Sequence, residues 1–217
     1  MKDSNSKCPP SNEGTNIQNL ARIGKRKLAK KESFLADVSE QELIKFFTAF
    51  DLAEKSYNEI MRNFPPQSRC RGLEANVLNS RIIDEVQKQF PDKCKFLKYK
   101  RFALMYKGYT FLFKKLDKRG VPMNIKTQSS EAIANQMQTC LFDPKDYENP
   151  IVFFGYQENK SGMLHNPHFV YIDDGRVKWR LIEEEISLRN IKTIGMAATS
   201  ETLLPKIKEN KKKKKAI

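Results

Sequence analysis

Eight lysines and arginines lie in the segment from Lys98 to Arg119, where the only acid is Asp117. Six aromatic residues, from Tyr99 to Phe113, are interleaved with them. Cations neutralise backbone phosphates and aromatic rings stack on bases, so this composition is typical of a nucleic-acid contact. The candidate phosphate contacts are Lys98, Lys100, Arg101, Lys107, Lys114, Lys115, Lys118 and Arg119.

Three tyrosines of this segment are candidates for a second kind of contact. If the bound strand is single, an exposed member of Tyr99, Tyr106 and Tyr109 is expected to stack on a base. Further along the chain, Lys178 and Arg180 alternate with apolar residues at the period of a β-strand. One face of that strand should therefore be cationic, which adds these two residues to the candidate phosphate contacts.

Asp146, Glu158 and Lys160 suggest a different chemistry, the Mg²⁺-dependent cleavage of nucleic acid. Glu158 and Lys160 form an E-x-K pair after an expected strand, as in nucleases of the PD-(D/E)xK type, where acids hold the metal and activate water. Such triplets arise by chance in a chain with 30% charged residues, and Asp146 falls in an expected loop. A binding protein without a catalytic site or cofactor is therefore favoured, and the nuclease is the first alternative.

Two histidines raise the question of a bound metal. His165 and His168 lie near Asp173 and Asp174, but the proline in the run HNPH prevents a helical presentation of both rings. We therefore interpret these histidines as turn or surface residues and expect no metal site.

Residues 138–142 match the short Q-x-x-L-F pattern with which bacterial proteins dock on the replication sliding clamp. An adaptor that binds the clamp or an acidic protein is the second alternative function. Docking requires an exposed, extended peptide. Because Cys140 and Leu141 continue the apolar face of an expected helix, burial of this segment is favoured.

The basic segment is expected to form a β-hairpin that turns at Lys107 and Gly108, because two apolar runs rich in aromatic residues meet there. A second hairpin should turn at Asp173, Asp174 and Gly175. The expected strands cover residues 102–106, 109–116, 150–157, 169–172 and 177–182, and residues 121–127 are expected to extend the sheet.

Three helices should flank these strands. Ser39 and Glu42 form a capping box at the start of an amphipathic helix over residues 40–64, and a second helix covers residues 73–90. Ser129 or Ser130 caps a third helix, which points Ile133, Met137, Cys140 and Leu141 to one side. Two helices followed by strands with one inserted helix indicate an α+β fold, with a mostly antiparallel sheet of about five strands.

The net charge of +14 is concentrated at the two ends of the chain. Residues 1–36 and 202–217 are rich in lysine and poor in apolar residues, so we expect two disordered basic tails around one α+β domain over residues 37–201. Charge placed where phosphates can reach it favours a polyanion as the partner.

Four cysteines, Cys8, Cys70, Cys94 and Cys140, have no C-x-x-C spacing, which favours reduced thiols over a disulfide framework or a zinc site. The sequence also contains no apolar run long enough to span a bilayer. These two features predict a cytoplasmic protein.

One stretch of the chain resembles a known family. The runs Thr110–Lys115, Ser129–Asn135 and Pro150–Gly155, with Ile125 between the first two, are similar in order and spacing to a segment of the RexA-type phage-exclusion proteins. The resemblance, over roughly residues 102–162, implies a homodimeric, sequence-tolerant DNA-binding protein of a prophage or mobile element, with a membrane partner. The helical N-terminal region and the lysine-rich tail depart from it and put this partner in doubt.

Overall fold

The computed structural model describes residues 24–138, 142 and 148–188. The chain divides into two compact units, Met1–Glu183 and Glu184–Ile217. The architecture below is that of the first unit. Of the second unit, the described residues 184–188 are helical. The predicted tail over residues 202–217 lies outside the described residues.

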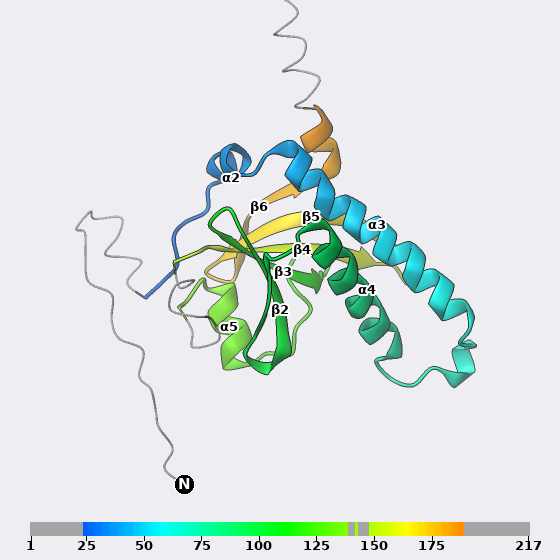
Figure 1. The fold of residues 1–217 in the computed structure, drawn as a ribbon. Helices are drawn as coiled ribbons and strands as arrows, with labels where there is room; N and C mark the ends of the chain where they lie inside the picture. Colours follow the sequence, from blue (N-terminus) through cyan, green and yellow to red (C-terminus); the bar gives the residue numbers. More distant parts are fainter. Residues whose placement is uncertain (1–23, 139–141, 143–147, 189–217) are drawn as a thin grey trace, which may run out of the picture. The chain divides into compact units, whose positions relative to one another are not determined.

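A six-stranded sheet forms the centre of the first unit, with the strands in sequence order from β1 to β6 (Figure 1). All neighbouring pairs are antiparallel except β3 and β4, which are parallel. A parallel pair needs a crossover connection, and the helix α5 (Gln128–Ala134) lies in it. The strands are β1 (Cys94–Leu97), β2 (Arg101–Tyr106), β3 (Tyr109–Lys115), β4 (Ile151–Glu158), β5 (Leu164–Asp173) and β6 (Arg176–Ile182).

This arrangement confirms the predicted α+β class, although the sheet has one strand more than expected. The additional strand is β1, a short edge strand that pairs with β2. The expected extension over residues 121–127 is wrong, because only a single bridge between Leu116 and Pro122 forms there. Asp117 explains the difference: its Oδ1 accepts hydrogen bonds from the backbone N–H groups of Arg119 and Val121, which closes a turn.

Both predicted hairpins are confirmed, and their turn residues explain why. Lys107 and Gly108 join β2 to β3 with φ angles of 51° and 76°, and Asp174 and Gly175 join β5 to β6 with φ angles of 54° and 65°. Two successive residues with positive φ define the tight turn whose twist matches that of the paired strands. Each turn is therefore specified by its own local sequence.

Aromatic side chains fill the interface between one face of the sheet and the long helix α3 (Glu40–Arg62). Phe46 contacts the rings of Phe111 and Phe169 at centroid distances of 4.8 and 5.0 Å. Phe47 contacts Phe154 at 5.2 Å. The predicted capping box at Ser39 and Glu42 is present, and α4 (Leu73–Gln89) packs on α3. The two predicted helices thus cover a common face of the sheet.

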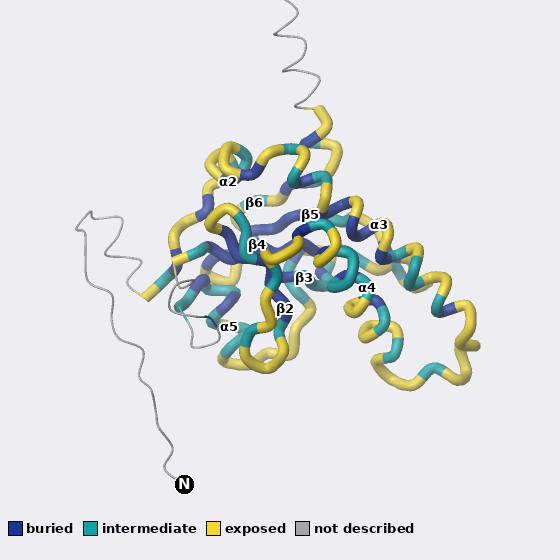
Figure 2. The backbone as a smooth tube through the Cα atoms, viewed as in Figure 1, coloured by how far each residue is buried: buried dark blue, intermediate teal, exposed yellow. Residues whose placement is uncertain are grey.

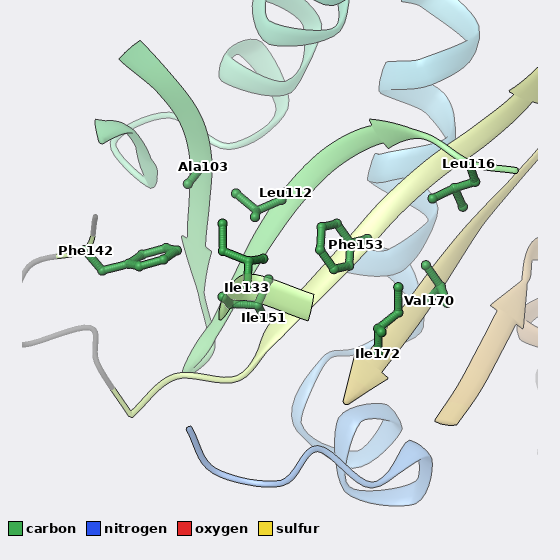
Figure 3. Close-up of a cluster of buried hydrophobic side chains, with 9 residues drawn as sticks. All are labelled: Ala103, Leu112, Leu116, Ile133, Phe142, Ile151, Phe153, Val170 and Ile172. Atoms are coloured by element: carbon green, nitrogen blue, oxygen red, sulfur yellow. The ribbon is translucent and has the colours of Figure 1, made fainter. Parts of the chain in front are cut away.

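The opposite face of the sheet packs on α5, and Figure 3 shows this second core. Its members are Ala103, Leu112, Leu116, Ile133, Phe142, Ile151, Phe153, Val170 and Ile172. The helix is capped by Thr127, with Ser130 completing a capping box, rather than by Ser129 or Ser130 as expected. It ends at Ala134, so Met137 lies beyond it, and Cys140 and Leu141 lie outside the described residues. Buried residues concentrate in the central strands between the two helical layers (Figure 2).

The expected disordered arm over residues 1–36 is wrong for its last part. Residues 24–36 belong to the folded unit, and Lys31–Asp37 form the helix α2. Phe34 is fully buried and contacts Tyr109 and Trp179, each at a centroid distance of 5.1 Å. A few apolar residues in this basic segment therefore suffice to dock it on the sheet, because β3 and β6 supply an aromatic surface for them. No helix in the described part of the chain is long and apolar enough to cross a membrane.

Candidate nucleic-acid interface

The sheet opens between β2 and β3. The ladder between these strands ends at the pair Leu104 and Phe111. Beyond this pair, β2 remains bonded to β1 as far as Arg101, and β3 remains bonded to β4 as far as Lys115. In Figure 3 the two strands lie together near their turn and spread apart toward the other end. Each strand thus follows its outer neighbour, and the two inner edges are not paired with each other.

A cavity of about 240 Å³ lies at this opening. Arg101 lines it from β2 and Lys114 lines it from β3, with Lys100 beside them. Asn79 of α4 and Tyr99 complete the polar part of the lining, and Phe102 and Phe113 form part of its wall. The lining contains three cations and no Asp or Glu.

The charged forms of Arg101 and Lys114 are destabilised in this position. Burial lowers the pKa of Arg101 below its ordinary value. Burial also lowers the pKa of Lys114, and repulsion from the nearby Arg101 lowers it further. In the described residues neither side chain forms an ion pair or a hydrogen bond. Two half-buried cations that repel each other form a site to which an anion is attracted.

The residues beside the cavity adopt an unusual backbone conformation. Tyr99 and Lys100 both lie in the left-handed region, with φ angles of 61° and 53°. Consecutive left-handed residues other than glycine are uncommon, and such conformations concentrate at ligand-binding sites. Tyr99 is 89% exposed next to the cavity. Phe96 of β1, which contacts Phe102 at a centroid distance of 5.5 Å, is 59% exposed.

Of the three tyrosines considered for stacking, Tyr99 alone is exposed. The hydroxyl of Tyr106 donates a hydrogen bond to Glu42, which lies on α3. Tyr109 is buried, and its hydroxyl donates to Asp37 Oδ2 at 2.7 Å. The structure therefore reduces three candidate stacking residues to one.

The other predicted contacts of the basic segment are distributed over different environments. Lys115 Nζ lies 2.6 Å from Glu158 Oε2, and Lys107 Nζ lies 3.9 Å from Glu42 Oε1. Lys98 is exposed next to Tyr99, whereas Lys118 and Arg119 are exposed in the turn after β3. Of the eight candidate phosphate contacts, Lys107 and Lys115 are thus paired with acids, whereas Lys98, Lys118 and Arg119 are exposed.

Lys178 and Arg180 lie on β6, at the edge of the sheet opposite β1. The guanidinium of Arg180 donates to the carbonyl oxygen of Arg119, so it braces the turn after β3. Lys178 is exposed. With strands about 4.8 Å apart, β6 lies roughly 14 Å from β3. The structure therefore separates Lys178 from the cavity at the opening.

The residues of the nuclease hypothesis do not form a metal site in the described part of the chain. Glu158 is paired with Lys115, and Lys160 is exposed in the turn after β4. Asp146 lies outside the described residues. No group of three His, Cys, Asp or Glu residues is placed to hold a metal within the ranges that the structure describes.

His165 and His168 are likewise not combined with Asp173 and Asp174. His165 is exposed on β5, whereas His168 is buried and its Nδ1 lies 2.7 Å from the carbonyl oxygen of Asn166. Burial lowers the pKa of His168, so the neutral ring is favoured. Asp173 and Asp174 instead form ion pairs with Lys25.

The Q-x-x-L-F segment is described only at its two ends. Phe142 is buried, with the guanidinium of Arg26 centred 4.1 Å from its ring. Residues 139–141 lie outside the described residues. Phe142 therefore belongs to the core, whereas the expected burial of Cys140 and Leu141 falls outside the described residues.

A larger cavity of about 390 Å³ lies between α4 and the end of β4. Its charged groups are largely paired with one another: Arg69 with Glu74 at 2.8 Å, and Lys115 with Glu158 at 2.6 Å. Because these charges compensate each other, this cavity attracts an anion less than the opening between β2 and β3 does. Cys70, a free thiol, is exposed beside it, and Cys94 of β1 is also free.

Sequence reasoning missed Asn79 and Phe96 as neighbours of the cavity. The run Cys94–Leu97, which forms β1, shows no sustained alternation of apolar and polar residues, so no period-2 signal marks this strand in the sequence. Asn79 gave no signal, since only the packing of α4 brings it to the opening. Comparisons with protein-family models, with curated proteins and with solved structures find no match.

Proposed function

We propose that this protein binds nucleic acid, with DNA as the favoured form, and that it does so without catalysis. The observation that carries the proposal is the pair Arg101 and Lys114, two half-buried cations that share a cavity lined by no acid. A phosphate between them would replace their mutual repulsion with two charge-assisted hydrogen bonds. Lys98 and Lys100 extend the positive charge along the adjoining surface.

The chemistry of the site favours a polyanion that is not read by sequence. Arg and Lys contacts to phosphate fix the position of a strand but carry no base information. The uncharged polar side chains that line the cavity are those of Asn79 and Tyr99. Sequence-tolerant binding follows from such a lining.

The test is a salt titration of binding to a labelled oligonucleotide. Arg101→Gln and Lys114→Gln should each weaken binding and reduce the slope of log K against log salt by about one. Lys178→Gln is the matched control, because it removes an equal charge at the opposite edge of the sheet. If all three variants behave alike, the opening is not the contact, and if the unaltered protein binds no oligonucleotide the proposal fails.

The role in phage exclusion, the homodimer and the membrane or replication partner stay predictions. The exclusion role, the homodimer and the membrane partner rest on the resemblance over residues 102–162, and the replication partner rests on the Q-x-x-L-F run over residues 138–142. Sedimentation of the full chain with and without oligonucleotide measures the oligomeric state. A phage-plating assay with the Lys114→Gln variant would connect binding to exclusion.

A further inference from the structure

We infer that the opening selects single-stranded nucleic acid, holding one backbone phosphate between Arg101 and Lys114 while the adjoining base stacks on Tyr99. This inference rests on the proposed function and specifies its substrate class. The site would consist of the cavity between β2 and β3 together with the exposed ring beside it.

The position of the cations argues for a single strand. Arg101 and Lys114 are half-buried and line a cavity of about 240 Å³. A flexible single strand can direct one phosphate into such a recess. A rigid duplex is contacted by cations spread over an exposed surface. Here Lys115 and Lys107 are paired with Glu158 and Glu42, which leaves Lys98, Lys118 and Arg119 as the exposed cations of the segment outside the cavity.

The exposure of Tyr99 also favours a single strand. Its ring is 89% exposed, although burying an aromatic ring ordinarily stabilises a fold. The left-handed backbone at Tyr99 and Lys100 holds this ring beside the cavity. In a duplex the base faces are covered by their neighbours, so a ring can stack only after a base is unstacked at a cost in free energy. A single strand offers its base faces directly.

Phe96 is a second exposed aromatic ring close to the cavity. It lies on β1 and contacts Phe102, which lines the cavity. Tyr99 and three cations line the recess, and Phe96 is an exposed ring in contact with its wall, so the site combines the two elements of sequence-tolerant single-strand binding, stacking platforms and a positive groove. The sequence between the two rings, Leu97 and Lys98, adds another cation.

The experiment compares the full chain with its Tyr99→Ala and Tyr99→Phe variants on three probes of equal length. The probes are a single-stranded oligonucleotide, the same oligonucleotide with abasic sites, and its duplex. We expect the unaltered protein to bind the single strand at least tenfold more tightly than the duplex. Tyr99→Ala should lose about tenfold on the single strand, as expected for one stacked base, and little on the abasic or duplex probe. Tyr99→Phe should bind like the unaltered protein.

Other outcomes would overturn the inference in distinguishable ways. Equal binding of single strand and duplex, with Arg101→Gln weakening both, would leave nucleic-acid binding intact and remove strand selection. An equal loss of affinity of Tyr99→Ala for all probes would show that the ring contributes to binding without stacking on a base. A mononucleotide that binds as tightly as the oligonucleotide would show that the opening holds a nucleotide and not a strand. Absence of binding to every probe would overturn the proposed function as well.

Discussion

Arg101 and Lys114 line the same cavity although the strands that carry them are no longer paired with each other at that point. Each strand is instead held by its outer neighbour, β1 for Arg101 and β4 for Lys114. The two cations are therefore fixed by separate parts of the sheet. Their repulsion cannot be relieved by a carboxylate among the residues that line the cavity.

This arrangement predicts that binding and stability compete at Lys114. Lys114→Met should raise the melting temperature by about 1–3 °C, because it removes a charge that burial and Arg101 both disfavour. The same variant should bind an oligonucleotide more weakly. Thermal melts at low salt measure the first effect, with Lys178→Met as the control that should leave the melting temperature unchanged. A lower melting temperature for Lys114→Met would contradict the electrostatic argument.

Glu42 should make stability depend on pH in the acidic range. Burial raises the pKa of Glu42, but hydrogen bonds from Tyr106 and Ser39 outweigh it and hold the pKa below its ordinary value of 4.5. A carboxyl group with a lowered pKa stabilises the fold above its unfolded pKa, and this contribution is lost as the pH falls through the folded pKa.

The corresponding variant is Glu42→Gln, which should lower the free energy of unfolding by about 1 kcal/mol at pH 7. The difference from the unaltered protein should shrink as the pH falls through the lowered folded pKa of Glu42, because the carboxyl group then becomes protonated in the folded state as well. Urea titrations at several pH values measure this difference in the free energy of unfolding. Glu59→Gln, on an exposed position of the same helix, should show no such pH dependence.

Gly155 lies opposite Lys114 in the register of β3 and β4. A Cβ atom at this position would lie 2.4 Å from the carbonyl oxygen of Lys114 and 2.5 Å from Cγ of Leu116. Gly155→Ala should therefore cost about 2–3 kcal/mol and lower the melting temperature by about 5–10 °C. Gly162→Ala, which meets no atom within 4 Å, should cost only about 1 kcal/mol through its positive φ. Similar losses for the two variants would exclude the close approach as the cause.

Phe34 tests whether residues 31–37 stabilise the fold. Phe34→Ala should cost about 3–5 kcal/mol, because its fully buried ring contacts Tyr109 and Trp179. Leu28→Ala is the matched control from the same basic segment, since Leu28 is 49% exposed and should cost less than about 0.5 kcal/mol. Chemical denaturation of both variants gives the comparison. If Phe34→Ala and Leu28→Ala were equally stable, residues 31–37 would not contribute to the fold, as expected for a disordered arm.

The variant Glu158→Ala distinguishes a binding protein from a nuclease. Because Glu158 is held by Lys115, we expect Glu158→Ala and the unaltered protein to leave plasmid DNA equally intact in the presence of Mg²⁺. Gel electrophoresis after prolonged incubation measures this. Cleavage that requires Glu158 would establish the nuclease alternative and refute a purely binding role.

The features that the sequence predicted correctly are those encoded within a few neighbouring residues. The hairpin turns at Lys107 and Gly108 and at Asp174 and Gly175 are specified by residues that tolerate positive φ. The capping box of Ser39 and Glu42 fixes the start of α3 through hydrogen bonds three residues apart. The α+β class follows from such local signals and from the apolar periods of the strands.

The candidate site depended on contacts between distant parts of the chain. The sequence predicted a cationic and aromatic segment, but it did not distinguish Lys114, which faces a cavity, from Lys115, which is neutralised by Glu158. Neighbours along a strand point to opposite faces, and what each face meets is decided by packing.

By itself, the amino-acid sequence determined the hairpins, the two long helices and the total of positive charge around Lys98–Arg119. Only the tertiary structure decided that β2 and β3 part beyond Leu104 and Phe111, that Tyr99 is exposed and that Phe34 is buried. The physical reason is that turns and caps are settled over three or four residues. The ending of a strand ladder and the compensation of a charge depend on partners that the fold brings together from far along the chain.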